Sequence, residues 1–148
     1  MKHGSSPIDV PRWESLELLA SEQLGRICII DGAGVPIAFP VNYVLATVDG
    51  RGVVVFRVAP TSSIAQSTGP ASFEVDRVEP QLGRAWSVIV RGQLRGADGP
   101  GLLPDSKPWA EVGRHRWMTV EIESISGRRF VPVTVDDDFS VEWQQFVG

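Results

Sequence analysis

The sequence predicts a mainly β protein, an antiparallel six-stranded β-barrel with peripheral helices. Six segments either alternate apolar and polar residues or are rich in β-branched residues, as strands are. Turn sequences such as Asp31-Gly32-Ala33-Gly34 and Asp49-Gly50-Arg51-Gly52 separate the early segments, and short turns join antiparallel neighbours. Many short strands with few helices favour a sheet that closes on itself.

The first elements are a lead and a helix. Residues 1–11 contain Pro7 and Pro11 without a periodic pattern, and they are expected to be flexible. Residues 12–23 carry Trp13, Leu16, Leu19 and Ala20 at helical spacing, with glutamates elsewhere, which predicts an amphipathic helix. We expect its apolar side chains to contact the core rather than a ligand.

Six strands are expected to follow, over residues 26–30, 35–47, 53–56, 71–76, 86–95 and 117–123. Pro36 and Pro40 lie within the second strand, which indicates an edge, a bulge or a bend, and a bent strand suits a small barrel. Residues 127–130 are expected to close or bulge the last strand. Residues 102–114 are expected to form a loop with a helical turn.

Composition limits the classes of function. Hydrophobic residues make up 43% and charged residues 22% of the 148, which fits one soluble domain, assigned to residues 12–132 with a C-terminal tail at 133–148. The net charge of −4 disfavours nucleic acid, and no apolar run is long enough to span a membrane. One cysteine, Cys28, permits no internal disulfide, which suits a cytoplasmic protein.

Metal chemistry is not expected. One cysteine and two histidines, of which His3 lies in the lead, do not make a usual zinc ligand set. The run Asp136-Asp137-Asp138 is interpreted as a solvated turn. Trp143 and Phe146 follow in the tail, three residues apart, and could dock as a short helix on a second subunit.

The stretch from Val53 to Asp76 carries the main chemical signal. An apolar strand ends in a cation, Arg57, and after Pro60 the hydroxyls of Thr61, Ser62 and Ser63 stand where a short helix could start. A cation that faces hydroxyls and free backbone N–H groups can bind a phosphate. The same residues also fit an ordinary surface turn, so both interpretations stay open at this point.

The order of five motifs resembles the pyridoxamine 5′-phosphate oxidase-like superfamily, the flavin-binding split barrels. The resemblance covers about residues 12 to 130. Its motifs are Pro40-Val41-Asn42-Tyr43, Val55-Phe56-Arg57 with Thr61-Ser62-Ser63, Ala71 to Asp76, Trp86 to Gly92, and His115-Arg116-Trp117 through Arg129. It implies a split β-barrel that is homodimeric, with FMN held between two subunits.

The resemblance also implies the site. Arg57 would pair with the cofactor phosphate, helped by Thr61, Ser62 and Ser63. Val41, Asn42 and Tyr43 would run along the isoalloxazine ring, with Phe56 on the same wall. Trp86, Ser87, His115, Arg116 and Trp117 could come from the partner chain, although core or dimer packing explains the two tryptophans equally well.

One departure from the family concerns charge. Many relatives have a lysine near the position of Ser63, whereas this chain has no lysine between Lys2 and Lys107. A single cation holds a phosphate less firmly than two, so the deazaflavin F420 is an alternative to FMN.

Two functions remain open from the sequence. The first is a flavin-dependent oxidoreductase that acts on a small molecule, since a flavin performs redox chemistry without a catalytic triad. The second is a non-catalytic split-barrel protein that stores or senses a flavin, haem or other ligand. The sequence identifies no catalytic residue.

Overall fold

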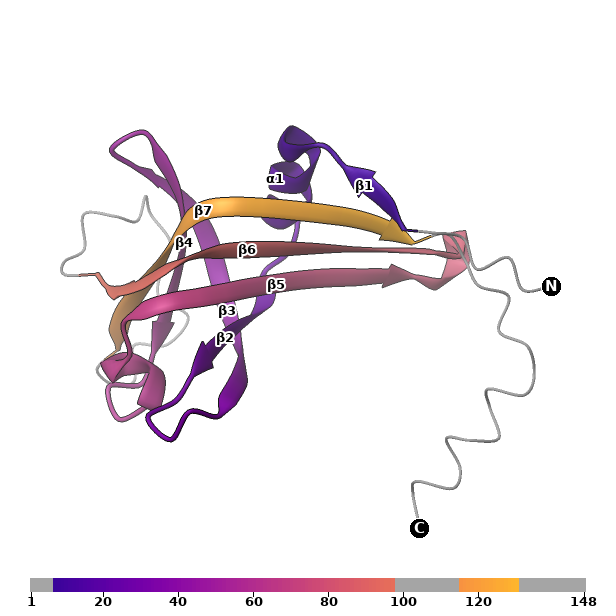
Figure 1. The fold of residues 1–148 in the computed structure, drawn as a ribbon. Helices are drawn as coiled ribbons and strands as arrows, with labels where there is room; N and C mark the ends of the chain where they lie inside the picture. The colour runs from indigo at the N-terminus through magenta and orange to yellow at the C-terminus, as the bar shows by residue number, and fades with distance from the viewer. Residues whose placement is uncertain (1–6, 98–114, 131–148) are drawn as a thin grey trace, which may run out of the picture.

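The computed structural model describes residues 7–97 and 115–130, and these form a barrel of antiparallel strands (Figure 1). Hydrogen-bonded neighbours follow the order β1-β7-β4-β3-β2-β5-β6, and a further pairing of β6 with β7 closes a ring of six strands. β1 lies outside this ring, beside β7. The predicted six-stranded antiparallel barrel is therefore confirmed, with one additional short strand.

Five of the six predicted strands are longer than the sequence patterns suggested, the strand predicted at residues 35–47 has the same length, and the helix predicted at residues 12–23 ends earlier, at Ala20. Between β1 and β2 lies the one α-helix of the described residues, α1, and two short 3₁₀ turns, η1 and η2, flank β5. The bounds are β1 Ile8–Val10, α1 Arg12–Ala20, β2 Leu24–Ile30, β3 Pro36–Val48, β4 Arg51–Val58, η1 Ser63–Gln66, β5 Gly69–Glu79, η2 Pro80–Leu82, β6 Arg84–Gly96 and β7 Arg116–Phe130. Two expectations, the loop at 102–114 and the tail at 133–148, lie outside the described residues.

β3 is the bent strand that its prolines predicted. Its first half, from Pro36 to Asn42, pairs with β2, and its second half, from Tyr43 to Val48, pairs with β4. Both prolines lie in the first half, where β4 does not pair. A proline cannot donate to a sheet ladder, so it is tolerated in a strand that is paired on one side only. The strand thus turns a corner of the barrel at residues 42 and 43.

A bulge in β7 changes which of its residues face the core. The pairing shifts between Arg91, which lies opposite Ser124, and Gly92, which lies opposite Ile122, so that one residue of β7 is extra. Met118 and Val120 are buried before the bulge, and Gly127 is buried after it. The inward positions are therefore even-numbered first and odd-numbered later. This is why the last strand runs on to Phe130 although its simple alternation ends near residue 123.

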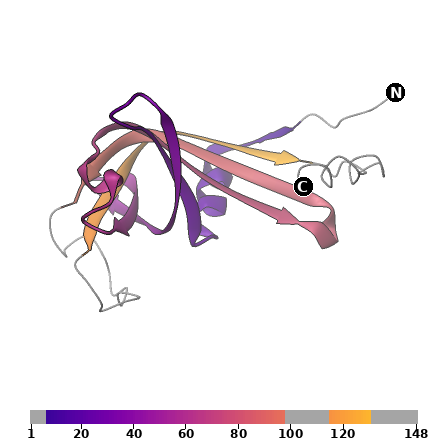
Figure 2. The same cartoon turned by 90° about the horizontal axis from the view of Figure 1, so that it is seen from below.

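Beyond the bulge, β5, β6 and β7 extend past the barrel as a projecting sheet, which is plain from two directions (Figures 1 and 2). α1 and β1 lie against this part of β7 (Figure 1). Arg129 of β7 makes an ion pair with Glu14 of α1. Gly127 allows this close contact, because a Cβ atom there would lie 2.5 Å from the Ser15 hydroxyl, which would have to move.

The core fills the barrel and reaches α1. Its largest fully buried side chains include Phe56, Phe73, Leu19 and Ile27. The Tyr43 hydroxyl donates a hydrogen bond to the Leu19 carbonyl, and the Tyr43 ring meets Phe73 edge-on at 4.8 Å between centroids. α1 is thus tied to the bend of β3. The predicted core contact is confirmed for Leu19, but it is wrong for Trp13, which is 63% exposed, and for Ala20, which is also exposed. The helix buries the face that carries Ser15 and Leu19, four residues apart, and Trp13 lies on the opposite side of the helix.

Residues 8–10, which the sequence pattern placed in a flexible lead, form a strand. Ile8, Asp9 and Val10 pair with Arg129, Arg128 and Gly127 as strand β1. Three residues between two prolines carry too little pattern to indicate a strand, and only pairing with β7 orders them. Within residues 7–97 and 115–130, no helix combines the length and the apolar character needed to cross a membrane.

Candidate functional site

The outer face of β3, β4 and β7 brings three predicted site residues together. Arg57 on β4 lies directly opposite Trp117 on β7. Its guanidinium carbon is 5.8 Å from the centre of the Trp117 ring, which is within the range of a cation–π contact. Asn42 is exposed and precedes Tyr43, the partner of Phe56, so it lies beside Arg57 on the same face. We call Asn42, Arg57 and Trp117 the outer-face cluster.

The predicted hydroxyl residues follow Arg57 closely in the chain, after the end of β4. Ser62 accepts a hydrogen bond from the Ile64 amide at 3.3 Å, so its hydroxyl caps η1. Thr61 and Ser63 are exposed. η1 spans four residues of 3₁₀ structure, and a single turn contributes little dipole. The phosphate ligands offered here are therefore Arg57 and two hydroxyls rather than a helix terminus.

Four predicted site residues point the other way, into the core. Val41, Tyr43, Phe56 and Trp86 are each at most 8% exposed and belong to the main apolar cluster. Strand alternation explains this placement, because Val41 and Tyr43 flank the exposed Asn42, and Phe56 precedes Arg57. The expectation that the Phe56 side chain lines the ligand wall does not match its burial, and the Trp86 side chain follows the core-packing alternative.

His115 and Ser87 occupy opposite ends of the chain's long strands. His115 is exposed and directly precedes β7, at the end where Arg57 lies. Trp117 contacts Arg57 of its own chain, so this part of the site forms without a second subunit. Ser87 lies on the projecting sheet, opposite Asp76 and Arg128. Ser87 lies ten residues before Ala97, which follows β6 at the end of the sheet where Arg57 lies. At about 3.3 Å per residue, Ser87 is therefore roughly 30 Å from that end.

A pocket that the sequence did not indicate adjoins the outer-face cluster. It has a volume of about 570 Å³ and lies over β7 between the β3–β4 hairpin and the end of β6. Its chemistry comes from Asp49, Arg51, Arg95, Thr119 and Glu121, with Val48, Val53, Gly96 and Ala97 completing the described lining. Alternation along β7 could have predicted that the side chains of Thr119 and Glu121 point outward. The pairing of β6 with β7, which places Arg95 beside them, could not be read from the sequence.

The motif from Ala71 to Asp76 has a structural role. Arg26 of β2 donates to Glu74 at 2.9 Å and to Asp76 at 3.3 Å, across the pairing of β2 with β5. Partial burial raises the pKa of Glu74, with Asp76 adding to this and Arg26 opposing it. These exposed ion pairs join neighbouring strands β2 and β5, contribute little to stability, and lie outside the outer-face cluster.

With this geometry in hand, comparison with known proteins gives a clear family. Residues 11–129 match the model of the pyridoxamine 5′-phosphate oxidase family. The chain belongs to this family. No curated protein matched the sequence. The family assignment agrees with the resemblance seen in the motifs and concerns the fold, while activity differs widely among proteins that share a fold.

Solved structures share the family fold over nearly their whole length. A conserved protein of unknown function from Corynebacterium diphtheriae is 26% identical with a TM-score of 0.70, covering 84% of this chain and 98% of its own. An FAD-binding protein from Mycobacterium smegmatis is 27% identical with a TM-score of 0.68 and the same coverage. An FAD-binding protein from Mesorhizobium loti, 22% identical with a TM-score of 0.60, covers 83% and 97% and shows the fold alone.

Within the residues that the structure describes, no group of three or more histidine, cysteine or acidic side chains is placed to hold a metal ion. The outer-face cluster instead has the chemistry of an anion site beside an aromatic ring. A guanidinium and hydroxyls bind phosphate oxygens, an amide bonds to the polar edge of a heterocycle, and an indole packs on an apolar ring. These residues fit a phosphate-bearing cofactor of the flavin type.

Proposed function

We propose that this protein is a flavin-binding oxidoreductase that holds the cofactor on its outer-face cluster and acts on a small molecule. The observation that carries the proposal is the pairing of Arg57 with Trp117 on the outer face of the barrel, followed a few residues later in the chain by the exposed Thr61 and Ser63. FMN, alone or as half of FAD, is the first candidate, and F420 is the second. A bound flavin would supply the redox chemistry, while Arg57 holds its phosphate and Asn42 orients its ring.

A homodimer completes this proposal. Ser87 and Arg57 lie too far apart on one chain to contact the same small cofactor, so Ser87 would reach the site only from a second copy. The family's implied dimeric assembly supports this arrangement. In such an assembly the projecting sheet of one subunit would lie near the outer-face cluster of the other.

The experiment that tests the proposal uses freshly purified protein. We expect a flavin or deazaflavin absorption spectrum, and mass spectrometry of the released cofactor would identify it. If the protein is colourless, titration with FMN, FAD and F420 should still quench cofactor fluorescence and raise the melting temperature. A colourless protein that responds to none of the three would refute the proposal.

A non-catalytic binding protein is the second candidate. The single cation of the outer-face cluster favours it, since residues 7–97 and 115–130 contain no lysine to add a second charge on the phosphate. Such a protein would store or sense a flavin, haem or another ligand. Steady oxidation of NADH, NADPH or reduced F420 through the bound cofactor, with an electron acceptor present, would exclude this candidate.

A further inference from the structure

The pocket over β7 is continuous with the outer-face cluster. The Ala97 amide donates to the Trp117 carbonyl at 2.8 Å, so a pocket-lining residue is bonded to the residue that contacts Arg57. Thr119 lies two residues after Trp117 on the same outward side of β7 and also lines the pocket. A ligand held by Arg57 can therefore extend past Trp117 into this space without crossing the sheet.

The pocket lining contains positive, negative and apolar side chains, which limits the class of ligand it can bind. Arg51 and Glu121 form an ion pair at 2.5 Å, and Asp49 and Arg95 supply one further charge of each sign. Asp49 and Glu121 disfavour phosphate groups on the side of the pocket next to the β3–β4 hairpin, and Arg51 is already paired with Glu121, so Arg95 on the β6 side is the cation left for a phosphate. A nucleoside suits Asp49 and Glu121 better, because carboxylates accept hydrogen bonds from ribose hydroxyls and the valines offer an apolar surface to a base.

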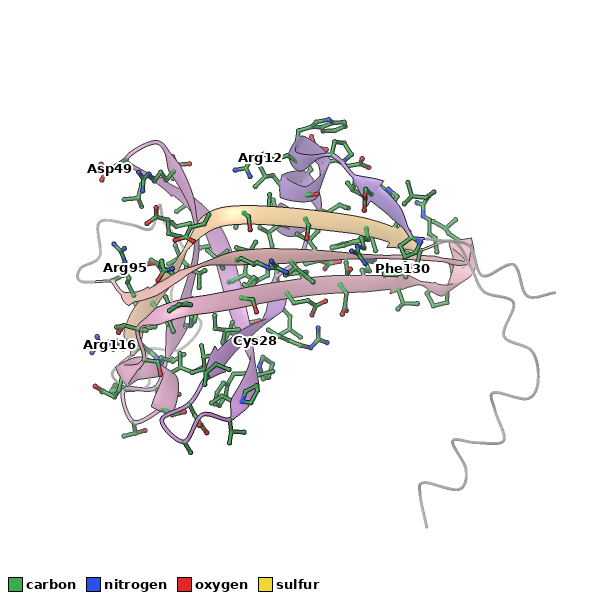
Figure 3. The ribbon with its side chains drawn as sticks, in the orientation of Figure 1. Arg12, Cys28, Asp49, Arg95, Arg116 and Phe130 are labelled. Carbon is green, nitrogen blue, oxygen red and sulfur yellow. The ribbon has the colours of Figure 1, made fainter. Side chains whose placement is uncertain are left out.

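Arg95 is placed to bind a second phosphate. Arg95 on β6 lies opposite Thr119 of β7, and Arg57 on β4 lies opposite Trp117, two residues earlier on β7. The separation is therefore two strand spacings across the sheet and two residues along it, which places the two backbones roughly 12 Å apart. Among the described residues, no carboxylate lies within ion-pair distance of Arg95. Figure 3 shows Asp49 and Arg95 at the same end of the molecule, and both residues line the pocket. Two long arginine side chains can close that separation around a diphosphate.

We infer that this pocket binds the nucleotide half of a dinucleotide flavin, so that the protein prefers FAD to FMN. The inference rests on the proposed function, because Arg57 must first hold the phosphate that the two cofactors share. Arg95 binds the second phosphate, Glu121 bonds to the ribose, and the half-buried Val48 packs against the base. The volume of about 570 Å³ lies within the range of about 300–1,000 Å³ for ligand pockets.

The test is equilibrium binding of FAD and FMN to the full chain, read by quenching of flavin fluorescence. The variants are Arg95→Gln and, as a matched control, Arg91→Gln, because Arg91 is an exposed arginine on the same strand that does not line the pocket. Wild type should bind FAD at least tenfold more tightly than FMN. Arg95→Gln should weaken FAD binding at least tenfold and change FMN binding less than twofold, while Arg91→Gln changes neither.

Equal affinities for FAD and FMN in the wild type, or FAD binding that Arg95→Gln leaves unchanged, would overturn the inference and leave the proposed function standing. Failure of folded wild-type protein to bind either flavin would overturn the inference together with flavin binding itself. Circular dichroism melting curves of both variants establish that they are folded before binding is compared.

Discussion

Arg57 and Tyr43 lie on neighbouring strands, one on the outer face of the sheet and the other in the core behind it. Arg57 is half-buried on the outer face, beside Trp117, while Tyr43 lies in the core beneath it on the adjacent strand. The Tyr43 hydroxyl bonds to α1, so the residue that precedes it, Asn42, is held at the bend of β3. Buried residues that do not contact a ligand can thus decide where the contacting residues lie.

At the residue scale, Tyr43→Phe should lower the free energy of unfolding by about 1–2 kcal/mol, because the buried Leu19 carbonyl loses its donor. The effect should depend on pH. Burial, with Glu22 adding to it, raises the pKa of Tyr43 well above its ordinary value of 10.0. The unfolded chain then loses this proton first, so wild-type stability falls as pH rises above about 10.

Tyr43→Phe lacks this titrating group and should lose less stability over the same alkaline range. Urea denaturation of both proteins at pH 8 and pH 10.5 measures the difference. A gap between wild type and variant that stays constant with pH would show that Tyr43 ionises equally in both states, contrary to its burial.

At the element scale, the bulge of β7 against β6 determines which β7 side chains beyond it face the core. Gly92 sits where the two strands come closest, and a Cβ atom there would lie 1.6 Å from the Glu121 carbonyl oxygen. No rotamer relieves a clash with backbone, so the strands would have to separate. The bulge therefore depends on this glycine, and the projecting sheet and the pocket-lining position of Glu121 depend on the bulge.

Gly92→Ala should accordingly destabilise the protein by about 3 kcal/mol or more, at the upper end of the usual cost of overpacking. Gly32→Ala is the matched control, since a Cβ at Gly32 would meet nothing within 4 Å. That variant should stay within about 0.5 kcal/mol of wild type. Thermal melts followed by circular dichroism compare the two, and a Gly92→Ala protein that melts with wild type would contradict the bulge geometry.

At the scale of the whole molecule, the projecting sheet and the distance from Ser87 to Arg57 both favour a dimer. Light scattering coupled to size exclusion should give twice the chain mass of 16.1 kDa. The mass should not change on dilution through the micromolar range if the interface forms part of the site. A mass of one chain at every concentration would remove Ser87 from the proposed site.

Much of this architecture follows from local pattern. Period-two alternation and β-branched runs located the six ring strands. The prolines of β3 indicated its bend, and the run from Val53 through Arg57 marked the cation of the outer-face cluster. The same alternation, applied to Val41 and Phe56, also predicts that their side chains point inward, away from Asn42 and Arg57.

Other features depend on contacts between distant segments. The change from even-numbered to odd-numbered inward positions in β7 arises at the bulge opposite Gly92. β1 forms only because β7 has a free edge with which it can pair. The pocket combines residues from β3, β4, β6 and β7, and no pattern within one strand specifies that strands far apart in sequence become neighbours. The residues of the outer-face cluster could therefore be predicted from the sequence. The pocket could be recognised only from the strand order of the folded sheet.

The central claim is that Arg57 holds the phosphate of a flavin, and the difference between FMN and riboflavin isolates that phosphate. Isothermal titration of wild type and Arg57→Ala with both ligands gives four dissociation constants, with Arg91→Ala as the control. Wild type and the control should bind FMN more tightly than riboflavin by about 10- to 150-fold, the equivalent of about 1.5–3 kcal/mol for a charged hydrogen bond. Arg57→Ala should bind the two ligands with nearly equal affinity, and a preference for FMN that survives this substitution would contradict the account.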